Sequence, residues 1–407
     1  MRRVLQKGVY YVPGKVGGVI YDSRDGFLYH LDREAKDLLT SILLAPTSSL
    51  HVDGEDDLIS ELTNKKLMVP QSTFAGKSDI QELRGDPKIT FAWIEVTTDC
   101  NLKCIHCYEG DRLHNGIVMS MATYSRIIGE LVDIGVRRIQ LIGGEPMTTP
   151  HLKDFLDHVV GKFDFIEIYT NATLITQKWV DYFKRNDVHV AVSIYSYDHH
   201  CHDAITGTRG SCVKSNAAIK LMADAGVKYR VRNVLMKGVD FGDKNTHLYT
   251  LSRNRDVVRM TGRASVGLLT VENVKKRLIT KNSFSRPIRK QQVAKMVGGN
   301  NCFSSHLYFG VDGTVYPCVM ERRISHGNIH DGHLANLLKP EILGFSKDFV
   351  DECQDCEFRY FCFDCRPDSI GGKITEKPWY CTYHPSTGEW ESVDDFMQRF
   401  QQKHCLS

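Results

Sequence analysis

Residues 97–108 read Thr-Thr-Asp-Cys-Asn-Leu-Lys-Cys-Ile-His-Cys-Tyr, and this stretch decides the fold. Three residues and then two separate its cysteines, so one loop can turn three thiolates toward a common point. The preceding residues 89–96 are rich in β-branched and aromatic side chains and predict a strand. Loops at the carboxyl ends of strands hold cofactors in α/β folds, so the pattern predicts a metal site there.

Two kinds of metal centre fit this spacing. Three thiolates are enough to hold three irons of a 4Fe–4S cube, and the fourth iron is then free to bind another group. The alternative is a structural zinc ion, which normally takes four protein ligands, and His106 is the candidate for the fourth. The rest of the chain favours the cluster.

The Cys-x3-Cys-x2-Cys spacing of Cys100, Cys104 and Cys107, followed by the aromatic Tyr108, resembles the radical S-adenosylmethionine (SAM) superfamily. The resemblance implies that SAM chelates the open iron and that the reduced cluster cleaves it to a 5′-deoxyadenosyl radical. The three cysteines would then be the catalytic cluster ligands, and Tyr108 would lie at the cofactor. In such enzymes the protein positions and shields a radical that the cofactors generate.

Length and composition describe an ordinary globular chain. Its 407 residues are enough for two or three domains, with 42% hydrophobic and 25% charged residues. The net charge of +3, without a dense basic run, argues against nucleic acid as a partner. We expect a cytoplasmic protein without a membrane partner, because neither a membrane-span pattern nor a secretory signal is evident. Thirteen cysteines in such a chain indicate metal binding rather than disulfides.

Residues 1–71 form a small N-terminal unit. Two strands are predicted at 18–22 and 26–31, joined by a turn at Asp25-Gly26, and Asp32 is placed to cap a following helix. Leu58, Ile59, Leu62 and Leu67 indicate a second helix. The unit resembles the winged-helix recognition element of enzymes that mature ribosomally made peptides, which adds the leader peptide to its sheet edge. The alternative is a structural cap, and residues 72–87 are interpreted as a linker.

From residue 88 to about 285, strands and helices alternate. A helix capped by Ser120 has apolar residues at helical spacing, and further helices separate the strands predicted at 138–142, 165–169, 188–194, 229–235 and 261–270. We expect two further strand–helix repeats after 235. This alternation predicts an α/β domain of parallel strands with outer helices. The resemblance implies that it is the partial (β/α)6 barrel of radical SAM enzymes.

Polar residues follow the predicted strands. Gly143-Gly144-Glu145-Pro146 combines glycines that permit close backbone approach with a carboxylate that can accept from an ammonium. After the cysteine loop it resembles the superfamily motif that binds the amino group of SAM. Asn171 and Ser193 end the next two strands, where relatives contact the SAM ribose and carboxylate. Alone, each of these is also typical of an ordinary turn.

The last part of the chain, from 286 to 407, is rich in cysteine. Seven cysteines are spaced along it, and a hairpin turned by Asp312-Gly313 is predicted before the second of them. Two zinc sites are one interpretation. The order of elements resembles the SPASM domain, which holds two auxiliary iron–sulfur clusters. By that resemblance the distal cluster takes Cys353, Cys356, Cys362 and Cys381, and the nearer one takes Cys302, Cys318 and Cys365.

One spacing departs from the SPASM pattern. Cys362 and Cys365 are separated by two residues, where the pattern usually has three. Sulfatase-activating members carry an aspartate after the cysteine that matches Cys318, and here that position is Val319, which argues against formylglycine formation. Short motifs around Cys356, Cys365 and Cys381 instead resemble peptide maturases, including those of graspetide-type clusters.

The sequence therefore predicts a radical SAM oxidoreductase that abstracts hydrogen from a precursor peptide and forms a cross-link, preferably a thioether. Its expected partners are the leader of that peptide and a reductant such as flavodoxin or ferredoxin. The alternatives are a carbon–carbon cross-linking or epimerising enzyme and, from another class, a zinc-stabilised binding scaffold without redox activity.

Overall fold

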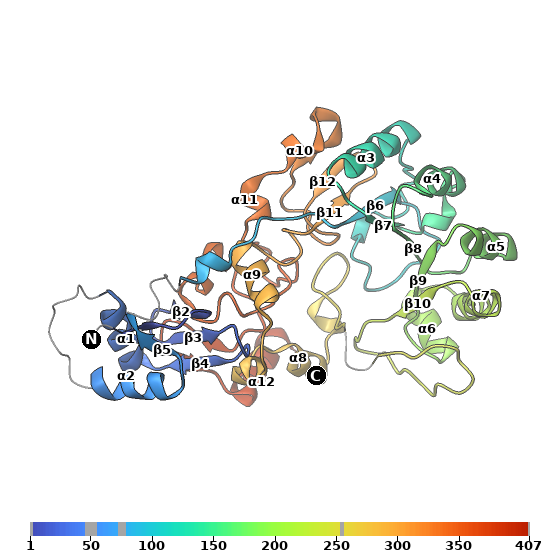
Figure 1. Ribbon diagram of the computed structural model, residues 1–407. Coiled ribbons are helices and arrows are strands. Elements are labelled where there is room, and N and C mark those ends of the chain that lie inside the picture. Colours follow the sequence, from blue (N-terminus) through green and yellow to red (C-terminus); the bar gives the residue numbers. More distant parts are fainter. Residues whose placement is uncertain (1–2, 45–54, 72–78, 253–255, 406–407) are drawn as a thin grey trace.

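A curved eight-stranded sheet forms the core of the larger part of the molecule, at the right of Figure 1. The computed structural model describes residues 3–44, 55–71, 79–252 and 256–405. The sheet order is β10-β9-β8-β7-β6-β11-β12-β13, and the strands from β10 to β11 in this order are parallel. The strands are β6 (Phe91–Thr97), β7 (Arg138–Gly143), β8 (Phe165–Thr170), β9 (His189–Ser193), β10 (Tyr229–Arg232), β11 (His306–Phe309), β12 (Thr314–Tyr316) and β13 (Gly327–Asn328).

Helices connect the parallel strands. They are α3 (Met121–Asp133), α4 (Leu152–Val159), α5 (Gln177–Arg185), α6 (His199–Thr206) and α7 (Ser211–Ala225), of which α3, α4, α5 and α7 line the outer face of the sheet (Figure 1). Helix α3 shows why they form. The Ser120 side chain accepts from the Thr123 N–H, and Tyr124, Ile127 and Leu131 recur on the buried face. The α/β class with a central parallel sheet is confirmed.

Two sequence predictions after β10 are wrong. Residues 261–270 form turns and a short 3-10 helix at Val266–Leu268 instead of a strand. Gly262 has a φ of +58°, and the Arg263 N–H donates to the Cys107 carbonyl at 2.9 Å, so this segment folds over the cysteine loop. In the described chain, no named strand pairs with the outer edge of β10. The sixth parallel strand is β11, which joins the opposite edge beside β6.

The N-terminal unit has its own sheet and core. Strands β2 (Val9–Pro13), β3 (Gly18–Asp22) and β4 (Leu28–Leu31) form an antiparallel sheet, and β1 (Arg3–Leu5) pairs with β5 (Met68–Pro70). Helices α1 (Arg33–Leu44) and α2 (Glu55–Asn64) complete it. The predicted hairpin and the Asp32 cap are confirmed, because the Asp32 carboxylate accepts from the Ala35 N–H at 2.9 Å. Part of the linker interpreted at 72–87, residues 72–78, lies outside the described residues.

A buried glutamate anchors this unit to the C-terminal part. Glu357 accepts from the Tyr383 hydroxyl at 2.6 Å and lies 3.2 Å from the His30 ring nitrogen. The backbone of Gly14 and Gly17 in the β2–β3 turn passes so close to this carboxylate that a Cβ on either would overlap it. The N-terminal sheet is therefore packed directly on the segment that carries Cys356.

The C-terminal part is mostly loops with short elements. The predicted Asp312-Gly313 hairpin is confirmed between β11 and β12. Helix α8 (Val271–Arg277) precedes the C-terminal part. The further elements of that part are α9 (Lys290–Gly298), α10 (Leu334–Leu337), α11 (Pro340–Leu343), β14 (Tyr383–His384), β15 (Glu389–Trp390) and α12 (Val393–His404). Single 3-10 turns lie at 80–83, 110–112, 146–148, 266–268, 281–284, 329–331, 347–349 and 353–355.

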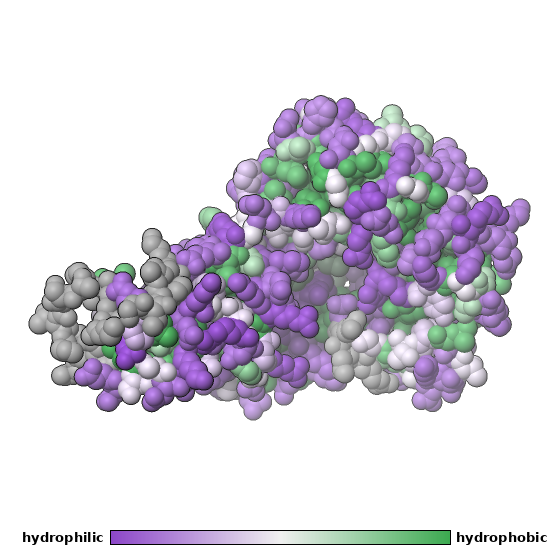
Figure 2. All heavy atoms as spheres, in the orientation of Figure 1, coloured by the Kyte–Doolittle hydropathy of each residue, from purple (hydrophilic) through white to green (hydrophobic). Residues whose placement is uncertain are grey.

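The surface alternates between small hydrophobic and hydrophilic groups and is hollowed between the barrel and the rest of the molecule (Figure 2). Among the described helices, none is both long and apolar enough to cross a membrane.

The packing of the barrel core leads to the first prediction, which concerns the free energy of unfolding. Phe155 of α4 is fully buried, with its ring 4.6 Å from that of Tyr124. Phe155→Ala should lower the free energy of unfolding by about 3–5 kcal/mol, because it removes an aromatic ring and leaves a cavity. Val132→Ala, at an exposed position on α3, should change it by no more than about 0.5 kcal/mol. Urea denaturation followed by circular dichroism measures both, and equal effects would contradict this account of the core.

Candidate functional site

The loop with Cys100, Cys104 and Cys107 lies at the carboxyl end of β6. The N–H groups of Lys103 and Ile105 donate to the carbonyls of Thr206 and Ile205 at the end of α6, at 2.8 and 3.1 Å. The loop is therefore held from the side by a helix that is distant in sequence.

The three thiols share an environment withdrawn from water. Burial raises the pKa of Cys100 and of Cys104 to about 12, and the neighbouring thiols act in the same direction. Burial also raises the pKa of Cys107, while the charge of Arg263 lowers it. Thiolates in such a place need a strong positive partner, and a bound metal provides one because coordinating thiols are deprotonated. The residues present therefore fit an iron–sulfur cluster.

His106 packs away from the solvent within the same loop. Its ring meets Tyr195 edge-on at 4.7 Å, and burial lowers the pKa of His106 to about 4. Across the described residues, no three or more His, Cys, Asp and Glu side chains gather closely enough to hold a single metal ion.

The backbone of Gly143, the last residue of β7, and of Gly144 packs directly against the end of β6 and the start of the cysteine loop. The Gly144 N–H donates to the Thr97 carbonyl at 2.9 Å, and the Glu145 N–H donates to the Asp99 carbonyl at 2.7 Å. A Cβ on Gly144 would overlap the Asp99 carbonyl oxygen, and one on Gly143 would overlap that of Thr97. The structure requires glycine at both positions for the close approach of the two segments, and close approach to a ligand stays a prediction.

The Glu145 side chain links its own turn to the carboxyl end of β8. Its buried carboxylate accepts from the Thr170 hydroxyl at 2.6 Å, the Asn171 N–H at 2.7 Å and the Met147 N–H at 3.0 Å. Burial raises the pKa of Glu145 to about 7 despite these donors. Pro146 begins the 3-10 turn that follows. The Glu145 carboxylate already accepts hydrogen bonds from three donors of the chain itself, so its binding of the SAM amino group stays a prediction.

Asn171 and Ser193 both lie beside the cysteine loop. The Asn171 amide donates to the side chain of Asn101 at 2.8 Å, next to Cys100. Burial raises the pKa of Tyr169 and of Tyr195, the neighbouring Ser193 side chain acts in the opposite direction on both, and the Tyr195 ring contacts His106. The strand ends therefore gather at one edge of the sheet, as the sequence indicated.

A buried network that the sequence analysis missed connects this loop to Cys318. Glu109 pairs with Arg112 at 2.9 Å and with Arg322 at 3.2 Å, and Arg322 also donates to the Cys318 carbonyl at 3.2 Å. Arg112 reaches Glu95 of β6 at 2.9 Å. Burial and the charge of Glu95 raise the pKa of Glu109 to about 7. The sequence offers one weak indication of this network, the acidic residue Glu109 directly after Tyr108. Two of the residues in the network, Glu95 and Arg322, are distant in sequence, so the sequence alone does not connect them to Glu109.

Cys302, Cys318 and Cys365 form a second group. The neighbouring Cys318 side chain lowers the pKa of Cys302, the charge of Cys365 acts on Cys302 in the opposite direction, and the charge of Cys318 acts on Cys365. The acidic side chains whose charges act on this group are each engaged by a cation: Glu321 by Arg323, Asp364 by Lys347 and Arg366, and Asp368 by Arg277. These carboxylates are therefore poorly placed to become a further metal ligand.

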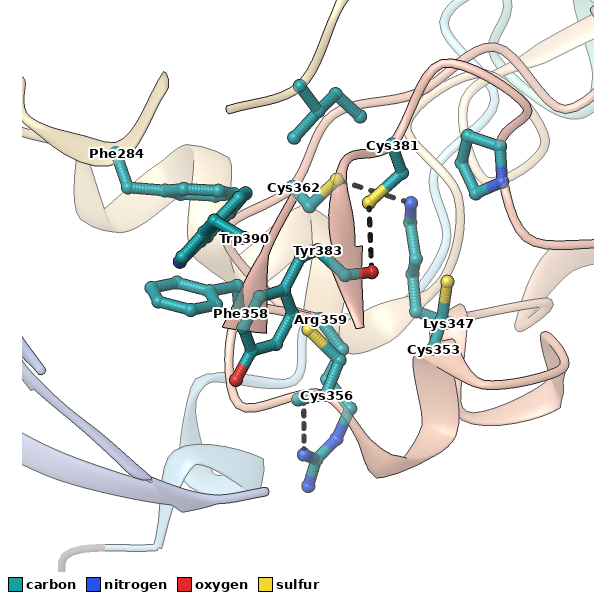
Figure 3. Close-up of a pocket in the computed structure, with 12 residues that line it drawn as sticks. Phe284, Lys347, Cys353, Cys356, Phe358, Arg359, Cys362, Cys381, Tyr383 and Trp390 are labelled. Carbon is teal, nitrogen blue, oxygen red and sulfur yellow. Dashed lines mark hydrogen bonds between the residues drawn. The ribbon is translucent and has the colours of Figure 1, made fainter. Parts of the chain in front are cut away.

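The other four cysteines line one cavity (Figure 3). Cys353, Cys356, Cys362 and Cys381 surround it together with an aromatic wall formed by Phe284, Phe358, Tyr383 and Trp390. Burial raises the pKa of Cys353 to about 12 and that of Cys362 to about 11. The sequence assigned these four cysteines to one cluster, and the structure brings them to one place.

Comparison with known families defines the class of protein. Residues 94–248 match the radical SAM superfamily, and residues 302–357 match SPASM, described as an iron–sulfur cluster-binding domain. The chain therefore carries a radical SAM domain and a SPASM domain, which imply 4Fe–4S clusters and SAM as cofactors.

Characterised relatives cover most of the chain. It is 24% identical over 375 residues to the antilisterial bacteriocin subtilosin biosynthesis protein AlbA of Bacillus subtilis (strain 168), covering 86% of this chain and 82% of that protein. Mycofactocin maturase MftC of Mycobacterium tuberculosis (strain CDC 1551 / Oshkosh) is 26% identical over 279 residues, covering 62% of this chain and 71% of that protein.

Solved structures share the fold. Streptococcus suis SuiB matches with a TM-score of 0.56 at 14% identity, covering 96% of this chain and 99% of that chain. Native anSMEcpe with bound AdoMet matches with a TM-score of 0.53 at 18% identity, covering 77% and 97%.

The contact between Gly144 and Asp99 gives the second prediction. Gly144→Ala should displace the cysteine loop and reduce SAM cleavage on the order of 100-fold, because small misplacements of reacting groups are costly. Iron bound by the C-terminal cysteines should remain. Gly129→Ala, where an added methyl meets open space on α3, is the matched control. Production of 5′-deoxyadenosine measures the effect, and unchanged production would show that the close approach is dispensable.

Proposed function

We propose that this protein is a radical SAM maturase that modifies a ribosomally made precursor peptide in the cytoplasm. The observation that carries the proposal is the placement of a separate N-terminal sheet against a cluster-binding part that is itself joined to the cysteine loop. Relatives support it: AlbA and MftC are named for biosynthesis and maturation, and SuiB has been solved bound to its precursor peptide SuiA.

In this proposal the chain divides into a peptide-recognition domain (1–71), a linker (72–87), the barrel (88–285) and the SPASM domain (286–407). Cys100, Cys104 and Cys107 hold the SAM cluster, and two auxiliary clusters occupy the other cysteine groups. Bound there, the first cluster supplies the 5′-deoxyadenosyl radical and the auxiliary clusters supply an electron acceptor. A flavodoxin or ferredoxin is the proposed reductant. SAM contacts are assigned to Tyr108, Gly143, Gly144, Glu145, Pro146, Asn171 and Ser193.

The cross-link proposed is a thioether from a peptide cysteine. The group of Cys302, Cys318 and Cys365 offers three thiolates, and the neighbouring carboxylates are paired with Arg or Lys. The Asp312 carboxylate accepts from the Thr314 N–H and hydroxyl of its own turn. A peptide thiolate is the softest remaining ligand for an open position, and binding there would deprotonate and orient it.

The reaction balances as an oxidation. One S–H and one C–H bond of the peptide break and one S–C bond forms. The hydrogen atom from carbon goes to the deoxyadenosyl radical, the thiol proton goes to solvent, and the remaining electron goes to the acceptor.

The third prediction tests this outcome. The reconstituted enzyme, given SAM, reductant and the peptide encoded by a neighbouring short open reading frame, should yield a product lighter by two hydrogens with one cysteine protected from alkylation. Mass spectrometry with iodoacetamide measures both. A product two hydrogens lighter that still alkylates at every cysteine would indicate a carbon–carbon link, and an unchanged mass with inverted stereochemistry would indicate epimerisation. A purified protein holding zinc and no iron would support the binding scaffold.

Leader binding is proposed at the open edge of β4. Strand order leaves β4 at one side of the N-terminal sheet, whereas Tyr11 of β2 already bridges to Asp79 at the other. The Asp22 N–H donates to the Phe27 carbonyl, and Ile20 lies opposite Tyr29. Because bonded and non-bonded pairs alternate, the N–H groups of Leu28 and His30 point to the open edge. An extended peptide can pair there.

The fourth prediction uses this alternation. Leu28→Pro removes an outward N–H and should weaken binding of the leader roughly tenfold, because a main-chain hydrogen bond is lost where proline is otherwise tolerated. Leu28→Ala loses the same side chain but keeps the N–H, and it should bind nearly as wild type does. Fluorescence anisotropy with a labelled leader peptide compares them. Equal affinities would exclude this edge. Point variants are preferable to deletion because deletion would uncover Glu357.

A further inference from the structure

A buried lysine faces the four-cysteine cavity. Lys347 lines it together with the cysteines, and its side chain is only 3% exposed (Figure 3). The Nζ atom donates to the Cys362 sulfur at 3.4 Å and lies 2.6 Å from an Asp364 oxygen. An ammonium withdrawn from water is costly unless several partners compensate it, and here a thiol is one of those partners.

Asp364 pairs with a second cation besides Lys347. The same fully buried carboxylate also pairs with Arg366, whose side chain is 4% exposed. One carboxylate therefore serves two cations. Because Arg366 would satisfy Asp364 alone, the ion pair does not by itself require a lysine at position 347. One positive charge is left over beside the thiols.

Other cations near the cavity are already balanced. Arg359 lines it but pairs with Asp348 at 3.1 Å and donates to the Pro13 and Cys356 carbonyls. Burial raises the pKa of Cys381 and the charge of Lys377 lowers it, but the Lys377 ammonium pairs with Glu352 at 3.2 Å. Lys347 is the cation that directly contacts a cysteine sulfur of this group in the described chain.

We propose that Lys347 is a positioning residue of the distal cluster, which hydrogen-bonds the Cys362 sulfur and raises the reduction potential of the cluster that these four cysteines hold. This inference rests on the cluster assignment of the proposed function. Hydrogen bonds to cluster sulfurs and nearby positive charge both stabilise the reduced form, which carries the more negative charge.

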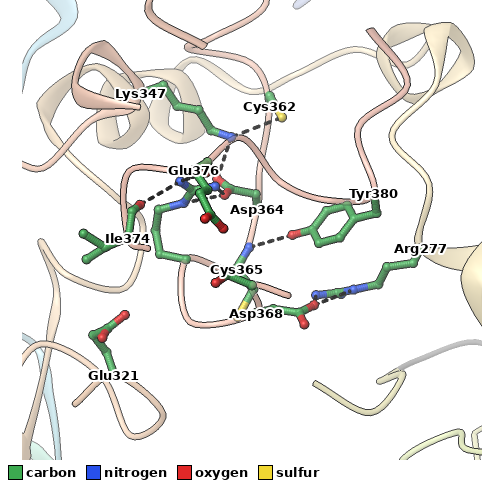
Figure 4. A network of polar contacts seen from close by, with 12 residues as sticks. Arg277, Glu321, Lys347, Cys362, Asp364, Cys365, Asp368, Ile374, Glu376 and Tyr380 are labelled. Atoms are coloured by element: carbon green, nitrogen blue, oxygen red, sulfur yellow. Dashed lines mark hydrogen bonds and ion pairs between the residues drawn. The ribbon is translucent and has the colours of Figure 1, made fainter. Parts of the chain in front are cut away.

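The position of Asp364 indicates which of the two auxiliary clusters the charge of Lys347 affects more. It lies between Cys362, a ligand of the distal group, and Cys365, a ligand of the nearer group (Figure 4). Lys347 is next to the distal ligand, so its charge favours an electron on the distal cluster over the nearer one. The electron left by the peptide would then move away from the substrate.

The fifth prediction compares Lys347→Met with Lys347→Arg in the full chain with clusters reconstituted. The methionine variant removes the charge at similar length and should shift one auxiliary cluster to a more negative midpoint potential. The arginine variant keeps the charge and should remain close to wild type. Lys377→Met is the matched control, because Glu352 already balances that charge, and its shift should be smaller. Redox titration followed by electron paramagnetic resonance measures all four proteins.

A second variant keeps the test decisive if Lys347→Met loses iron. Asp364→Asn removes the negative charge beside Lys347 and should shift the same cluster to a more positive potential. An unchanged potential in either variant, with full iron content, would overturn the inference. These measurements need neither peptide nor turnover. A failed inference therefore shows in the potential, whereas a failed proposed function shows as missing iron or an unmodified peptide.

Discussion

Compensation of buried thiolate charge is the constraint on which the structure depends. Burial pushes the pKa of Cys100, Cys104 and Cys353 far above the ordinary thiol value, so these side chains cannot ionise without a positive partner. Metal binding at these thiols would therefore be linked to folding, because each of the two C-terminal groups brings together cysteines from separate segments. The protein also supplies cations of its own near these thiols: the charge of Arg263 acts on Cys107, and Lys347 donates to the Cys362 sulfur.

The second constraint is how the cysteine groups are connected. Arg322 joins the carboxylate of Glu109 to the carbonyl of Cys318, and its guanidinium lies 3.7 Å from the centre of the Tyr308 ring. Glu357 similarly joins the N-terminal sheet to the segment after Cys356. Buried polar contacts therefore join the N-terminal sheet to the segment that carries Cys356, and join the first cysteine loop to Cys318, which suits a site whose parts must keep fixed separations.

Local patterns in the sequence predicted the parts whose physics is local. The spacing of Cys100, Cys104 and Cys107, the Ser120 cap and the Asp312-Gly313 turn each depend on a few adjacent residues, and the helix and turn were found as predicted. Residues 261–270 alternate like a strand, but their positions are set by the Cys107 carbonyl and Gly262. Similarly, nothing near Glu145 or Lys347 in the sequence indicates their partners, because those contacts form only when distant segments meet.

The pairing of β11 with β6 has a consequence for how the protein is made. The strand that leads into the cysteine loop receives its second neighbour from beyond residue 306, so during synthesis it stays an open edge while the whole barrel emerges from the ribosome. An open edge of Ala92 and Ile94, which are buried in the finished sheet, is prone to pair with other chains. If a cluster is inserted into the neighbouring loop before β11 has paired with β6, the sheet beneath that loop is still incomplete. If the cluster is inserted later, β6 already has both of its neighbouring strands.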